Sequence, residues 1–315
     1  MRLGGYAIQN PLSSTASSTG VLPLAPFGVW FNSNNNNYYV ATNPLFISGL
    51  TQSIVILSTT FSTTKTIYTP NNSAPASVIR GNTTSNVFIY KTSSANNTFY
   101  IYNASTYTLL GSFSPGVTYS SSYFDVDWVN NNIYIPYNLS GTSSTINVWS
   151  LGSTYSGPYS LQTTITYAQT SAVPNLLTID STYNRIITNG LNGRVAIIYL
   201  TSAGGVTQYN PTPQSSFLIV AIESNAGAAT DVTFDTNYYY ISNTNYGPIH
   251  IFRRSDFKYV KSLYVYQNTA GSGGYASFLY ADSTLNKLHI SYGTLANNYF
   301  PVIDVYNTDT TLSGI

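Results

Sequence analysis

The segment LTIDSTYNRIIT, residues 177–188, carries the pattern that decides the fold. An apolar stretch ends at Asp180, a short polar turn follows, and Asn184 comes directly before a second apolar stretch. Asp and Asn favour turns because their short side chains hydrogen bond to the nearby backbone and tolerate left-handed backbone angles. The segment therefore predicts a tight β-hairpin in which Asp180 caps the turn.

The same pattern recurs along the whole chain. Four further copies have the polar pair four residues apart: Asn32 and Asn36, Asn82 and Asn86, Asp127 and Asn131, and Asp282 and Asn286. A sixth copy, Asp235 and Asn237, has a turn that is two residues shorter. The first polar residues of consecutive copies lie 45 to 55 residues apart. Since a second, looser hairpin follows each copy, as in residues 99–113 and 249–265, each unit contains four strands.

Four antiparallel strands that repeat every 40–50 residues or so are typical of a β-propeller blade. We therefore predict an all-β fold, a six-bladed β-propeller of four-stranded antiparallel blades that forms a single domain over residues 22–315. A seven-bladed ring is the alternative. Residues 1–21 are predicted to form an N-terminal arm that closes the last blade with one strand, because such closure removes an exposed sheet edge.

The units resemble the YVTN-type surface propellers, in which an Asp-led turn precedes a Tyr-rich strand. The segment VIDVYNTD, residues 302–309, matches the second half of that pattern. The resemblance covers nearly the whole chain and implies a propeller fold on a surface protein. It implies no particular activity, since propellers host many functions.

The composition excludes several classes of protein. Only 7% of the 315 residues are charged and the net charge is +1, whereas an average domain has about 25% charged residues. A near-neutral chain argues against nucleic-acid binding, and the absence of Cys excludes disulfides and thiol chemistry. No apolar run approaches the ~20 residues of a membrane helix. The composition resembles that of virion and surface proteins of thermoacidophilic archaea and their viruses, because few ionisable groups limit charge repulsion in acid.

The candidates for catalytic or metal-binding residues are few. His250 and His289 lie on predicted strands of the fifth and sixth units and are interpreted as unrelated strand residues; the alternative is a pair of ligands in a central channel. Two histidines without a clear carboxylate partner make a weak metal site. We therefore expect no bound metal and no cofactor.

The carboxylates offer two close pairs, Asp125 with Asp127 and Asp231 with Asp235. Asp125 and Asp127 share one face of a strand, so both should point into the channel or both into solvent. Asp127 and Asp235 are already explained as turn residues, and Glu223 should lie at the exposed end of an apolar strand. We therefore expect no catalytic residues and no enzymatic activity.

Two surface features are distributed unevenly. Five Asn-x-Ser/Thr sequons are predicted glycosylation sites: Asn71, Asn82, Asn96, Asn103 and Asn138. All five fall in the first three units, whereas 15 of the 21 charged residues follow residue 139. The densest group of charges is a predicted partner contact, or alternatively a solvated hairpin that resists edge pairing: Arg253, Arg254, Lys258 and Lys261.

These observations favour a non-enzymatic structural or attachment protein of an archaeal virus particle. The propeller would serve as a platform for assembly or for binding host surfaces and glycans, with other virion or surface proteins as partners. We expect it on the virion or the extracellular surface; the first 14 residues lack the apolar segment of a secretory signal. The alternatives are a secreted or cell-surface propeller enzyme of an archaeon, resembling a lactonase or glycosidase, and an intracellular interaction scaffold.

Overall fold

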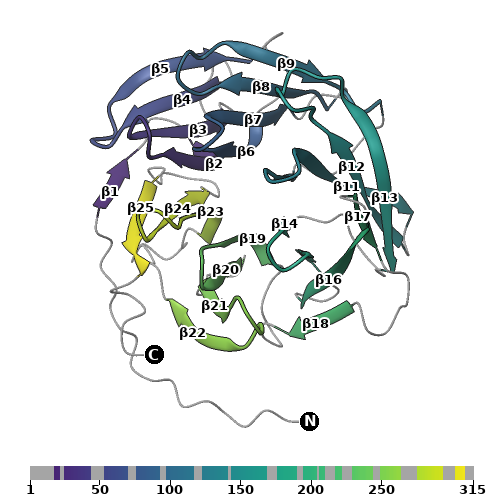
Figure 1. The fold of residues 1–315 in the computed structure, drawn as a ribbon. Coiled ribbons are helices and arrows are strands. Elements are labelled where there is room, and N and C mark those ends of the chain that lie inside the picture. Colours follow the sequence, from purple (N-terminus) through teal and green to yellow (C-terminus); the bar gives the residue numbers. More distant parts are fainter. Residues whose placement is uncertain are drawn as a thin grey trace.

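The structure is a computed structural model that describes most of the repeated units. The described residues are 18–21, 25–43, 53–69, 76–92, 97–116, 123–140, 143–168, 176–189, 194–203, 206–209, 217–221, 229–243, 249–263, 275–293 and 302–308. Within them the chain is an all-β propeller built from four-stranded antiparallel blades (Figure 1).

The described strands form six separate sheets, which follow one another in chain order around a ring and are called blades 1 to 6 here (Figure 1). The first three blades consist of β2 (Ala25–Asn32), β3 (Asn37–Asn43), β4 (Ser53–Ser58) and β5 (Thr63–Tyr68); β6 (Ala76–Asn82), β7 (Val87–Thr92), β8 (Phe99–Asn103) and β9 (Leu109–Phe113); and β10 (Asp125–Asp127), β11 (Asn132–Ser140), β12 (Ser143–Ser150) and β13 (Ser160–Ala168).

Blades 4 to 6 complete the set of described sheets. They consist of β14 (Leu177–Asp180), β15 (Arg185–Asn189), β16 (Arg194–Ala203), β17 (Val206–Tyr209) and β18 (Phe217–Ala221); β19 (Ala229–Phe234), β20 (Tyr238–Asn243), β21 (Ile249–Arg253) and β22 (Tyr259–Leu263); and β23 (Tyr275–Asp282), β24 (Lys287–Gly293), β25 (Val302–Asn307) and β1 (Ser18–Val21).

Two blades depart from a simple four-strand meander. In blade 4 the long strand β16 pairs with both β17 and β18 on its outer edge. In blade 6 the outermost strand is β1, which pairs antiparallel with β25 in the register Ser18 to Val305. The last blade thus combines strands from both ends of the chain.

The repeated polar pairs form equivalent turns between the first and second strands of each blade. In the five longer turns the second residue of the pair is a left-handed Asn, with φ between 48° and 53°. The first residue accepts backbone N–H bonds in all six turns; for example, Asp127 Oδ1 accepts from Val129 at 3.0 Å and Asp282 Oδ1 from Thr284 at 2.9 Å. The interpretation of these residues as turn caps is therefore confirmed.

The hydrophobic core is divided among the contacts between neighbouring blades, which are called seams here. Each of six buried clusters lies mainly along one seam, including the seam between blades 6 and 1, where Tyr280 packs against a blade 1 cluster. Aromatic residues dominate the seam between blades 1 and 2, where Trp30 lies 4.8 Å from Tyr39 and 6.4 Å from Phe88 between ring centroids. Each blade is therefore stabilised mainly by its two neighbours, as in other repeat proteins.

A second repeated turn position was not foreseen from the sequence. Between the third and fourth strands of four blades, an aromatic residue adopts a left-handed conformation with φ between 57° and 60°: Phe61, Tyr107, Tyr155 and Phe257. Such angles are unfavourable for bulky residues. Burial offsets the strain in at least two cases, since Tyr155 and Phe257 are 9% and 6% exposed. The sequence signal is a Ser or Thr two residues before each aromatic residue.

Gly81 on β6 is expected to tolerate no side chain. A Cβ atom at this position would lie 2.1 Å from the ring of Trp30, which is itself buried in the seam between blades 1 and 2. Gly81→Ala should therefore lower the free energy of unfolding by about 1–3 kcal/mol, as overpacked cores do. Urea unfolding checks this, and Trp30→Leu in the same chain should restore part of the loss. Equal stability of Gly81→Ala and the parent protein would contradict the packing.

Candidate functional site

A buried ionic cluster connects blades across the axis of the ring. Arg80 on β6 of blade 2 contacts two carboxylates on the first strands of other blades. Its Nε lies 3.1 Å from Asp125 Oδ1 of blade 3, and its Nη2 lies 3.5 Å from Asp231 Oδ1 of blade 5. Because blades 2 and 5 are three positions apart in the ring, Arg80 reaches across its centre. We call these three residues the channel cluster.

Each acid of the channel cluster also holds the next blade in sequence. Asp125 Oδ2 accepts hydrogen bonds from Thr178 Oγ1 and the Ile179 backbone N–H, both at 2.8 Å, on blade 4. Asp231 Oδ2 accepts from the Leu279 backbone N–H at 2.8 Å, on blade 6. The channel cluster therefore joins five of the six described blades.

Burial controls the proton affinity of these acids. Burial raises the pKa of Asp125, although Arg80 and the hydrogen bonds oppose the shift. Burial likewise raises the pKa of Asp231 to about 6, with Arg80 opposing and Asp125 adding to it. One guanidinium faces two carboxylates, so the channel cluster carries excess negative charge when both acids are ionised.

The acid pairs expected from the sequence do not act as pairs. Asp125 lies in the channel cluster, whereas Asp127 ends β10 and caps its own turn. Asp231 and Asp235 separate in the same way, because Asp235 Oδ1 accepts from the Asn237 and Tyr238 backbone. Glu223 lies outside the described residues.

The two histidines lie in different environments. His250 on β21 contacts Ser262 Oγ through Nδ1 at 3.0 Å, within blade 5. His289 on β24 is fully buried and stacks on Phe31 of blade 1 at 5.3 Å between centroids, with Tyr38 at 5.5 Å. Neither ring nitrogen of His289 has a hydrogen-bond partner among the described residues. Burial lowers the pKa of His250 to about 4 and that of His289 to about 3, the latter with help from Lys287.

His289→Phe is expected to stabilise the protein in acid. The unfolded chain binds a proton at His289 below pH ~6.5, while the folded chain resists it down to about pH 3, so the native histidine costs stability as the pH falls between these values. The variant should gain up to about 3 kcal/mol over the parent at pH 4 and differ little at pH 8. Urea unfolding at both pH values measures this. A difference that does not change with pH would contradict the buried neutral imidazole.

Two of the predicted glycosylation sites have described side chains. Asn82 Oδ1 accepts from the Ser85 backbone N–H at 2.7 Å, and Asn103 Oδ1 accepts from Ser105 and Thr106 at 2.9 Å. These bonds use the carbonyl oxygen and not Nδ2, the atom that an N-linked sugar would modify.

The other three sequons are only partly described. Asn138 lies on β11, but its side chain is outside the described residues, as are Asn71 and Asn96 entirely. Glycosylation of the five sites stays a prediction.

The predicted basic patch contains one residue that does not belong to the surface. Arg253 and Lys258 are exposed and flank Asp256 at 3.2 and 3.6 Å, and Lys261 is half-buried on β22. Arg254, in contrast, is 9% exposed and turns inward to Asp180 of blade 4. The sequence suggested that all four cations are exposed, and this is wrong for Arg254. The reason is its pairing with Asp180, which lies 74 residues away in the sequence and is brought close only by the ring.

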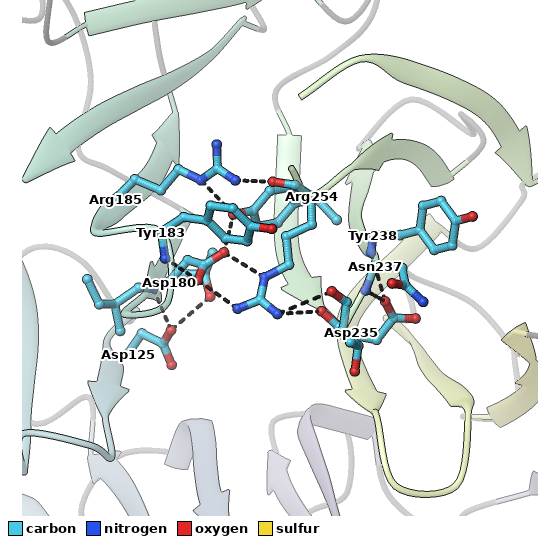
Figure 2. Close-up of polar contacts among 12 residues, drawn as sticks. Asp125, Asp180, Tyr183, Arg185, Asp235, Asn237, Tyr238 and Arg254 are labelled. Atoms are coloured by element: carbon cyan, nitrogen blue, oxygen red, sulfur yellow. Dashed lines mark hydrogen bonds and ion pairs between the residues drawn. The ribbon is translucent and has the colours of Figure 1, made fainter. Parts of the chain in front are cut away.

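Arg254 is the centre of a polar cluster at the seam between blades 4 and 5 (Figure 2). Its Nε and Nη2 donate to the two carboxylate oxygens of Asp180 at 2.8 and 2.7 Å, and its Nη1 donates to the Asp235 carbonyl at 3.0 Å. Tyr239 of blade 5 also donates to Asp180, and Arg185 of blade 4 donates to the Tyr239 hydroxyl and the Arg254 carbonyl. Burial opposes ionisation of Asp180, but Arg254 and Tyr239 outweigh it and lower its pKa.

Sequence reasoning missed Arg80, Arg185 and Lys91 as interior residues. Lys91 on β7 is 1% exposed, and burial lowers its pKa to about 8. The partners of Arg80 and Arg185 lie in other blades, so the local sequence does not indicate that these two residues are interior. In the part of the chain that the structure describes, no three His, Asp or Glu side chains are placed to hold a metal ion. No helix of the described chain is long and apolar enough to cross a membrane.

Comparison with known proteins identifies the fold and not a family. No family model and no curated protein matches the chain. Solved structures do match: the chain resembles U3-55K at 10% identity and a TM-score of 0.58, over 93% of this chain and all of that one. It resembles the RRP9 WD40 repeats at 10% identity and a TM-score of 0.57, over 93% and 99%.

A third match is the β-propeller domain of Myceliophteria thermophila Cps50 (Swd1), at 9% identity and a TM-score of 0.54, over 93% of this chain and 99% of that one. Identities this low establish architecture alone. Together with the blades and seams described above, they show that the chain folds as a β-propeller.

Proposed function

We propose that the chain is a non-enzymatic structural or attachment protein that serves as a rigid platform on a virus particle or other extracellular surface. Its partners would be other virion or surface proteins, or glycans of the host. WD40-type propellers generally mediate protein–protein interactions, which fits this role. The proposal includes membership of the YVTN-like surface propellers, supported by the repeated Asp-led turns before Tyr-rich strands.

The main support for this proposal is that the described carboxylates all make structural contacts. Seven aspartates have described side chains, and each one is engaged in a structural contact. Asp125 and Asp231 pair with Arg80, and Asp180 pairs with Arg254. The others accept backbone N–H bonds in turns: Asp127, Asp235, Asp256 and Asp282. Acids used in this way hold blades and turns together, which suits a scaffold better than a hydrolase that needs a carboxylate free to act.

The surface chemistry supports contacts that do not depend on charge. Tyr68 and Tyr259 are 63% and 50% exposed, and Tyr183 and Tyr199 are also exposed. Tyrosine suits protein and sugar contacts because it offers a flat apolar ring with a polar tip. Hydroxyl and amide groups also keep their hydrogen bonding in acid, where carboxylates lose their charge.

The proposal includes a ring of six blades. Six described sheets, with a buried cluster at each seam between them, support this number. Pairing of β1 with β25 would then close the ring with strands from both chain ends. An experimental structure with a seventh sheet would refute it.

The proposed platform has two unlike halves. Blades 1 to 3 contain all five sequons, and blades 4 to 6 contain most of the charge. Because chain order becomes position around the ring, a partner surface that avoids bulky sugars would meet blades 4 to 6.

Fractionation of the producing cells tests the proposed location. Quantitative mass spectrometry should find the protein enriched in purified particles or envelopes over the cell lysate, and protease added to intact particles should cleave it. Peptides with Asn71, Asn96, Asn103 and Asn138 should carry added sugar mass. Recovery of the unmodified protein only from the soluble lysate would overturn the proposal.

A further inference from the structure

One buried cation at the seam between blades 4 and 5 has no carboxylate of its own. Arg185 is 3% exposed, and its contacts among the described residues are with neutral groups: the Tyr239 hydroxyl, the Arg254 carbonyl, and the rings of Tyr183 and Tyr239. It forms no ion pair with any described residue. A buried charge without a partner is costly, so a counter-ion at this position would be strongly favoured.

The nearby acids are already committed. Asp180 uses both oxygens on Arg254, and it also accepts from Tyr239 and from the Tyr183 backbone N–H. Asp235 accepts two backbone N–H bonds through Oδ1 and the Tyr240 hydroxyl through Oδ2 at 2.6 Å. Neither acid is therefore left to neutralise Arg185.

The guanidinium of Arg185 has one nitrogen left to bind a ligand. Nε and Nη2 donate within the cluster, while Nη1 has no hydrogen-bond partner among the described residues. Figure 2 shows this nitrogen directed away from the other labelled side chains.

Tyr183 gives the position a partial cover. Its ring lies 4.6 Å from the guanidinium carbon of Arg185 and 5.3 Å from that of Arg254, and the residue is 40% exposed. An aromatic ring over a cation excludes water from one side, which strengthens electrostatic contacts on the other.

We propose that Arg185, beneath Tyr183 at the seam between blades 4 and 5, binds an oxyanion such as a carboxylate or a sulfate group. The anion would accept a charge-assisted hydrogen bond from Nη1, which is stronger than a bond between neutral groups. In an assembly the anion would be an acidic group of the partner. The proposal concerns the chemistry of the seam and does not depend on where the protein resides.

Titration with sodium sulfate tests the site on the purified full chain, with sodium chloride at equal ionic strength as the reference. Sulfate also stabilises proteins without binding to a site, so comparison with variants is needed to distinguish binding at Arg185 from this general effect. Saturable heat in calorimetry and a saturable rise in Tm are expected for the parent and for Arg253→Gln, a matched change of charge at an exposed position. Arg185→Gln should weaken binding at least tenfold. Sodium acetate in place of sulfate distinguishes a site that accepts carboxylates from one restricted to tetrahedral anions.

A second variant keeps the test decisive if Arg185→Gln does not fold. Tyr183→Ala alters a partly exposed residue and should weaken sulfate binding about threefold or more by admitting water to the guanidinium. A non-saturable response in the parent, or equal binding by the parent, Arg185→Gln and Tyr183→Ala, would overturn the proposal. Failure of this test would leave the proposed surface location standing, since that rests on fractionation.

Discussion

Replacing Arg80 with methionine is expected to lower the free energy of unfolding by about 3–5 kcal/mol at pH 8, because removing one partner leaves buried charge unpaired. Asp125 and Asp231 would then face each other across the ring without a cation. At pH 4 the loss should be much smaller. Burial raises the pKa of both carboxyls, and it raises that of Asp231 to about 6, so Asp231 is protonated in the folded protein at pH 4 and needs no cation there.

The direction of the pH effect follows from linkage. An acid whose pKa is raised in the folded state contributes to stability. This contribution is complete below the pKa of the unfolded chain, about 3.8, and is lost as the pH rises through the pKa of the folded state. Removing Arg80 raises those values further, so the variant should lose stability more steeply between pH 4 and 8. Urea unfolding across this range measures it.

Two further variants isolate the charge of Arg80 from its bulk. Arg80→Lys keeps the positive charge and should retain most of the stability at pH 8. Adding Asp231→Asn to Arg80→Met removes one unpaired charge and should recover part of the loss. A penalty for Arg80→Met that is the same at pH 4 and pH 8 would show that the residue acts by packing alone.

Asp180→Asn is expected to cost a similar amount, about 3–5 kcal/mol, because Arg254 would stay buried without its acid. The substitution preserves shape and leaves an oxygen able to cap the turn at Tyr183. Asp256→Asn is the matched control. Its ion pairs with Arg253 and Lys258 are exposed, so this substitution should change stability far less than Asp180→Asn.

A double-mutant cycle separates the pair from its surroundings. Asp180→Leu combined with Arg254→Met should be less destabilising than the sum of the two single changes, since no charge is left buried. Thermal unfolding with sulfate absent measures all four proteins. Strict additivity would mean that Asp180 and Arg254 do not interact as the seam geometry requires.

The sequence predicted the parts of the fold that depend on local chemistry. The Asp or Asn at each first turn caps its own backbone within three residues, so spacing alone located Asn32, Asp127 and Asp282 in equivalent places. The alternation of strands and turns then indicated blades. The left-handed aromatic residues of the second turns, such as Tyr107, were also readable in principle, because a Ser or Thr precedes each one at fixed spacing.

The contacts between blades could not be read from one sequence. Arg80 meets Asp125 after 45 residues, and Arg254 meets Asp180 after 74, only because the ring brings different blades together. Adjacent residues beside a turn can therefore differ in burial: Arg254 is buried, whereas Arg253 is exposed. Nothing in the local pattern distinguishes these two neighbours. Spatial position decided which of them pairs with an acid.

His289 works against the proposed adaptation to acid. A scarcity of charged residues suits low pH, yet a buried neutral imidazole between blades 6 and 1 is a liability there. The acids of the channel cluster act in the opposite direction, since their raised pKa values favour the folded state in acid. The balance predicts a protein that tolerates mild acid through its acids and weakens through His289 as the pH falls toward 3.

Electron cryotomography of purified particles or envelopes, with averaging of the repeated surface density, tests the central claim most directly. The account predicts ring-shaped densities on the outer surface that fit this propeller, with blades 4 to 6 against the neighbouring protein and blades 1 to 3 facing the medium. Surfaces without such rings, or rings whose blades 1 to 3 are buried against a neighbour with bare Asn71, Asn96, Asn103 and Asn138, would contradict it.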